Sequence, residues 1–143
     1  MKGSDLFVRC LENEGIDTIY GIPGEENIDV MESLHDSCIE FVTTRHEQGA
    51  AFMADVHGRL TGTAGVCLAT LGPGACNLVT GAADANMDRA PMVAIAGQAE
   101  TSRMHKESHQ HVDLVQLFAP IAKYASQIRE AGVIPEVLRK AFK

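Results

Sequence analysis

The chain has 143 residues, is 45% hydrophobic, and carries a formal charge of −7 at pH 7. Its length fits one domain, since domains commonly hold about 100–150 residues. The negative charge and the lack of tryptophan argue against a nucleic-acid partner, which needs clustered cations and stacking rings. No apolar run approaches the roughly 20 residues that span a bilayer. Residues 1–5 lack a secretory signal core, so we expect a cytoplasmic protein without a membrane partner.

The chain alternates between helical and extended patterns. Ser4 is the expected N-cap of the first helix, and Gly15 follows its end. Residues 64–71 form a nearly continuous apolar run, which is typical of a strand covered on both faces. In chain order we expect helix 4–14, strand 18–20, helix 27–34, strand 40–44, helix 48–60, strand 64–71, helix 78–87, strand 91–96, a helix from Asp113 to Phe118, strand 121–128 and a closing helix from Pro135.

This alternation predicts an α/β fold, with a mostly parallel central sheet between two helical layers. The pattern shows no internal repeat and no linker, so residues 1–143 are expected to form a single domain. The chain stops inside a predicted helix. We therefore expect an N-terminal domain of a longer protein.

The four cysteines show neither a zinc-like spacing nor a disulfide framework. Cys67 lies inside the apolar run, and Cys10 lies on the apolar face of the first helix. We expect reduced cysteines that serve mostly in packing.

Glu47 is the first candidate site residue. It follows the strand predicted over 40–44 and opens a helix rich in small residues. A glutamate at a helix start often serves only to offset the helix dipole. Here Gly49 and Ala50 leave space beside the carboxylate. A shielded carboxylate of this kind can share a proton with a ligand nitrogen.

A second strand, loop and helix follow at residues 72–77. Two such loops at the ends of neighbouring parallel strands would meet at one edge of the sheet, where open α/β proteins bind ligands. Gly72 and Gly74 permit a close approach of backbone to a flat ligand, and Pro73 stiffens the loop. Asn77 either caps the next helix or presents its amide to a ligand, and its position favours neither alternative.

Two further motifs carry weaker signals. Residues 21–24 form a Gly-x-x-Gly turn that lacks the spacing of nucleotide-binding loops, so a structural turn explains it. Residues 105–111 contain three histidines, of which His105 and His109 have the i, i+4 spacing of metal ligands. No third ligand is well placed, and we assign no metal site. Ser108 beside a histidine forms no recognisable nucleophile motif.

Taken together, these segments resemble the N-terminal, pyrimidine-binding domain of thiamine-diphosphate-dependent enzymes, and acetolactate synthase large subunits in particular. The resemblance extends over nearly the whole chain. It is carried by residues 20–24, 45–51, 71–77, 87–91 and 97–98. It implies the thiamine-diphosphate-binding fold, a three-layer α/β/α domain.

The resemblance also implies roles for single residues. Glu47 matches the glutamate that hydrogen-bonds N1′ of the cofactor's aminopyrimidine ring. Gly24, Pro73 and Asn77 match cofactor-binding positions around that ring. Gln110 matches a glutamine that faces the reacting carbon and is the second expected catalytic residue. The implied reaction is decarboxylation of a 2-oxo acid such as pyruvate, with transfer of the two-carbon unit to a second carbonyl compound.

Some positions depart from the biosynthetic acetolactate synthases. His109 stands where those enzymes have phenylalanine, and His111 replaces a glutamate. The pattern from His109 to Asp113 is closer to the catabolic type, which leaves the acceptor substrate and any FAD open.

The motif that holds Mg²⁺ and the diphosphate is missing from the chain. In the family it lies in a separate domain, so this chain is expected to supply half of a site in a homodimer or tetramer, and to be inactive alone. Two alternatives stay open: a naturally separate subunit of a split decarboxylase, and a non-catalytic domain kept for assembly.

Overall fold

A central sheet of four parallel strands organises the domain. The computed structural model describes residues 1–104, 106 and 109–143. The strands are β1 (Thr18–Gly21), β2 (Glu40–Thr43), β3 (Gly65–Ala69) and β4 (Met92–Ala96), in the order β2-β1-β3-β4. Every pairing is parallel, which confirms the predicted sheet.

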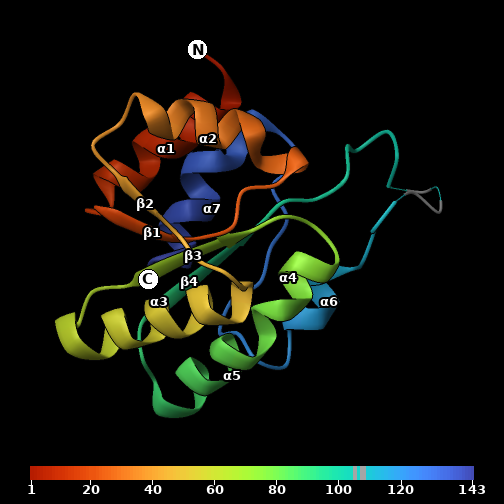
Figure 1. Cartoon of the computed structure of the whole chain (residues 1–143). Helices are drawn as coiled ribbons and strands as arrows, with labels where there is room; N and C mark the ends of the chain where they lie inside the picture. Colours follow the sequence, from red (N-terminus) through yellow and green to blue (C-terminus); the bar gives the residue numbers. More distant parts are fainter. Residues whose placement is uncertain (105, 107–108) are drawn as a thin grey trace.

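Helices cover both faces of the sheet (Figure 1). One layer contains α1 (Gly3–Asn13), α2 (Ile28–His35) and α7 (Ile134–Ala141). The other contains α3 (Glu47–Thr61), α4 (Pro73–Asn77) and α5 (Val79–Asp88), with α6 (Leu114–Phe118) beside α4. Two short 3₁₀ turns, η1 (Glu25–Asn27) and η2 (Ala131–Val133), precede α2 and α7. The predicted three-layer α/β/α architecture is therefore confirmed.

The two faces of the sheet bury different kinds of side chain. β3 is buried along its whole length, so its alternate residues serve opposite cores. Val66 and Leu68 join a core of large aliphatic residues supplied by α1, α2 and α7. Cys67 and Ala69 join a smaller core made mainly of alanines from α3.

The alanine-rich pattern of α3 follows from how closely this helix approaches its neighbours. A Cβ placed on Gly65 would lie only 2.0 Å from the carbonyl oxygen of Ala54, and one on Gly81 would lie 2.5 Å from the Cβ of Ala51. Larger side chains at these contacts would push α3 off β3 and α5. Its larger residues Phe52, Met53 and Val56 are exposed instead.

Cys67 and Cys10 match the expected packing role, whereas Cys38 and Cys76 do not. All four are free thiols. Cys67 is completely buried, and desolvation raises the pKa of its thiol to about 12. Cys10 is partly buried, whereas Cys38 and Cys76 are exposed.

Two local predictions are wrong. Lys2, not Ser4, is the N-cap of α1, and the Ser4 hydroxyl instead accepts a hydrogen bond from Ser33 Oγ at 2.9 Å. Residues 121–128 form no strand. This segment is held by side chains instead, with Ile128 packed against the aliphatic core and Gln127 bonded to Met104, so its apolar spacing reflects packing without strand pairing.

Candidate functional site

Glu47 is the first residue of α3 and stands beyond the carboxyl end of β2. The extended backbone of His46 begins the helix, and its Nδ1 accepts a hydrogen bond from the backbone N–H of Gln48 at 3.1 Å. This cap fixes the first turn and leaves the Glu47 side chain free of a capping role. The Glu47 side chain is half-buried.

Asn77 is the partner of the Glu47 carboxylate. Its Nδ2 donates to Glu47 Oε2 at 2.9 Å. Asn77 is the last residue of α4, and α5 has no side-chain cap. The structure therefore rejects the capping alternative and directs the Asn77 amide to the site carboxylate. A charge-assisted bond of this kind fixes the carboxylate plane.

The loops that follow β2 and β3 lie together, but not because their strands are neighbours. The prediction assumed neighbouring strands, but β1 lies between β2 and β3. α3 crosses back over the sheet and packs closely on β3 through Gly65. This crossing carries Glu47 to the carboxyl end of β3, where the loop that contains Gly74 begins α4.

Gly74 and Thr70 connect Glu47 with the turn at Gly24. A Cβ on Gly74 would lie 3.3 Å from Glu47 Oε1 and 2.9 Å from Thr70 Cγ2. A Cβ on Gly24 would overlap the Thr70 side chain at 2.4 Å. Thr70 also donates to Glu26 Oε2 at 3.0 Å. Sequence reasoning missed Thr70, although its place directly before the glycine loop was a usable signal.

Gln110 reaches the same edge from the opposite side of the loop. Gly72 has a φ of +54°, and a Cβ there would lie 2.2 Å from the Gln110 carbonyl oxygen. Only glycine combines this backbone angle with this contact. Pro73, the first residue of α4, is exposed beside it. The predicted site residues therefore gather at one edge of the sheet: Pro73 and Asn77 belong to α4, Glu47 and Gln110 lie against its first residues or end, and Gly24 contacts the preceding Thr70.

A second polar group joins α3 to α5 behind the site. Asp55 is 1% exposed, and Arg59 pairs with it through Nε and Nη2 at 2.9–3.0 Å. Arg59 also bonds Asp84 at 2.9 Å, and it bonds Asp88. The carboxylates of Asp55 and Asp88, Asp55 first, raise the pKa of Arg59. The i, i+4 spacing of Asp55 and Arg59 could have revealed the pair in the sequence.

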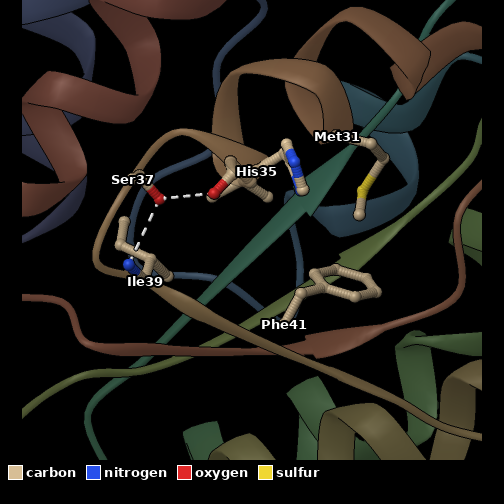
Figure 2. A pocket seen from close by; sticks show the side chains of 6 residues that line it. Met31, His35, Ser37, Ile39 and Phe41 are labelled. Carbon is tan, nitrogen blue, oxygen red and sulfur yellow. Dashed lines mark hydrogen bonds between the residues drawn. The ribbon is translucent and has the colours of Figure 1, made fainter.

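Residues that the structure describes line two hollows of similar size. One, of about 340 Å³, lies between α2 and β2 and is lined by Met31, His35 and Phe41 (Figure 2). It lies at the start of β2, at the opposite edge of the sheet from Glu47. The other, of about 330 Å³, lies on the site's edge and is lined by Glu25, Glu26, Ala99, Glu100, Arg103 and His109.

The described residues contain no cluster of three His, Cys, Asp or Glu side chains suited to a metal ion. His105, part of the metal hypothesis, and Ser108 lie outside the described residues. The part of the chain that the structure describes also has no helix long and apolar enough to cross a membrane.

The site residues fit the pyrimidine end of thiamine diphosphate. A carboxylate held by an amide can pair with a ring nitrogen, and the missing side chain of Gly74 keeps Glu47 Oε1 uncrowded. Pro73 and Gly74 present little bulk, as a flat ring requires.

Residues 1–117 match the model of the thiamine pyrophosphate enzyme family, N-terminal TPP binding domain. The chain belongs to this family, whose members are thiamine-diphosphate-dependent enzymes.

Within the family, acetolactate synthases are similar over 99% of the chain. A probable acetolactate synthase large subunit of Methanocaldococcus jannaschii is 44% identical over 142 residues, which cover 24% of its length. A catabolic acetolactate synthase of Raoultella terrigena and an acetolactate synthase of Bacillus subtilis are each 44% identical, and the match covers 25% of each. The chain thus spans about a quarter of the length of these relatives.

Proposed function

We propose that this chain supplies the pyrimidine half of a thiamine diphosphate site in an acetolactate synthase-like enzyme. The hydrogen bond between Asn77 and Glu47, with the backbone of Gly74 close to the other carboxylate oxygen, carries the proposal. This bond orients the Glu47 carboxylate through Oε2. The other oxygen, Oε1, is then the one that would meet a ring nitrogen. The family match over residues 1–117 supports the same assignment.

Each site residue has a distinct task in this proposal. Glu47 shares a proton with N1′ of the aminopyrimidine, and Asn77 keeps the carboxylate in the plane that allows it. Gly24 and Pro73 border the ring, and Gln110 faces the reacting carbon. The bound cofactor supplies the electron sink for loss of carbon dioxide from a 2-oxo acid.

The remaining parts of the reaction belong to other segments. Mg²⁺ and the diphosphate would be held by a further domain, so residues 1–143 form an N-terminal domain that is inactive alone. The donor is pyruvate or a related 2-oxo acid, and a second carbonyl compound takes up the two-carbon unit. His109 and His111 favour the catabolic type, for which FAD remains an option rather than a requirement.

We further infer that the enzyme is a cytoplasmic homodimer or tetramer. α3 and α5 expose large apolar side chains, among which Leu60 is 81% exposed and Met87 80% exposed. Phe52, Met53 and Val56 extend this surface along α3. A second copy of the enzyme would cover such a surface.

Two alternatives are less well supported. A separate subunit of a split decarboxylase and an assembly domain without catalysis would both share this fold. The similar relatives carry the matching region as part of one longer chain, which favours the first proposal over the separate subunit. The Glu47–Asn77 pair favours a catalytic role over assembly alone.

The test is the full-length protein assayed with thiamine diphosphate and Mg²⁺ against a panel of 2-oxo acids. We expect carbon dioxide release from pyruvate and formation of acetolactate. The chain of 143 residues, assayed in parallel, should release none. Absence of any decarboxylation by the full-length protein would contradict the proposed activity, and turnover by the short chain would contradict the half-site.

A further inference from the structure

Gln98 closes the base of the segment that joins β4 to α6. Its Nε2 donates to the carbonyl oxygen of Val112 at 2.9 Å, and its Oε1 accepts from the backbone N–H of Ala99 at 2.8 Å. One amide group therefore ties the start of this segment to its end. Figure 1 shows this segment leaving the sheet on the side where α4 and α6 lie.

We call the hydrogen bond from Gln98 to Val112 the clamp. Val112 is two residues from Gln110. The backbone of Gln110 rests on Gly72, and its φ of +58° lies in the left-handed region that non-glycine residues rarely adopt. Such a conformation is strained and persists only where surrounding contacts enforce it. The bond from Gln98 to Val112 is one such contact, because it fixes the chain directly after Gln110.

We propose that Gln98 is a positioning residue, which holds Gln110 against Gly72 at the site by clamping Val112. This inference rests on the proposed function, in which Gln110 faces the reacting carbon. Gln98 does not touch the cofactor's pyrimidine partner Glu47, so its loss should lower kcat and leave the affinity for thiamine diphosphate unchanged.

The variant Gln98→Glu in the full-length protein tests the clamp through pH. The new carboxyl group has the shape of the amide and, when protonated, can donate to Val112 and accept from Ala99. Once ionised it has no donor, so two acceptors face each other at Val112. The ratio of variant to wild-type kcat should be near one at low pH. It should fall about 100-fold as pH rises through the pKa of the new group, since a misplacement of 1 Å can cost that much.

Gln116→Glu makes the same chemical change at an exposed position of α6 and serves as the control. Its kcat ratio should not vary with pH. A ratio for Gln98→Glu that is as constant as that of the control would overturn the proposal.

A double-mutant cycle separates this inference from the proposed function. Gln110→Ala should lower kcat, and adding Gln98→Glu should lower it little further, because the clamp acts through Gln110. Fully multiplicative losses would overturn the positioning role and leave the proposed function intact. Unchanged kcat in Gln110→Ala would overturn the role of Gln110 and this inference with it. The cofactor site has its own test, which is the variant Glu47→Gln.

Discussion

The two helical layers pack on the same sheet with different kinds of side chain. One layer contains α1, α2 and α7, and the other contains α3, α4 and α5. The first uses large aliphatic side chains such as Leu11, Leu34 and Leu138. The second uses alanine and glycine, and holds its helices by polar pairs. Large side chains tolerate small shifts of a helix, whereas backbone contacts do not. The site therefore lies on the layer whose helices are placed most tightly.

The polar pair behind the site should show the largest effect on stability. Arg59→Met leaves the buried Asp55 carboxylate without its partner, which typically costs about 3–5 kcal/mol. Urea unfolding of the chain at pH 7 measures this loss. Arg9→Met, at an exposed position of α1, should change the unfolding free energy by less than about 0.5 kcal/mol.

The aliphatic layer should respond to loss of volume. Leu11 is completely buried, so Leu11→Ala should lower the unfolding free energy by about 2–5 kcal/mol. Leu60→Ala removes the same atoms from an exposed position of α3 and serves as the control in urea unfolding. Equal losses in the two variants would contradict the assignment of this core.

The small-residue layer should respond to added volume instead. Gly65→Ala places a methyl group against the Ala54 carbonyl and should cost about 1–3 kcal/mol. Gly132→Ala, where no atom lies within 4 Å of the added carbon, should be close to neutral. Tolerance of Gly65→Ala would mean that α3 can shift, and the contrast between the layers would fail.

The smallest expected effect concerns Cys67, and it is a difference in how fast the cysteines react with a thiol reagent. Because burial raises its pKa to about 12, only about one thiol in 10⁴ is ionised at pH 8, and thiolate is the reactive form. A thiol reagent at pH 8 should modify the exposed Cys38 and Cys76 and spare Cys67. In urea all should react. Rapid native labelling of Cys67 would show that α3 opens away from β3.

The sequence was sufficient for the parallel sheet and for placing the candidate residues Glu47 and Asn77 near its carboxyl edge, because both depend on local patterns. β3 is recognisable from its apolar run, and Glu47 and Asn77 from their places after strands. Strand order was not local: the position of β1 between β2 and β3 results from how α3 crosses the sheet. The strand predicted over 121–128 failed because its apolar spacing serves side-chain packing alone. Gln98 acts through a contact with Val112, a segment distant in sequence, which no spacing reveals.

The most direct test of the central claim is Glu47→Gln in the full-length protein. The amide keeps the shape of the side chain and can still accept from Asn77, but it cannot exchange a proton with a ring nitrogen. We expect kcat to fall about 10²–10⁴-fold with the fold intact, as is typical for loss of a proton-transfer group. Glu40→Gln, at an exposed position of β2, should leave kcat unchanged. Full turnover by Glu47→Gln would contradict the account and leave this domain only a role in assembly.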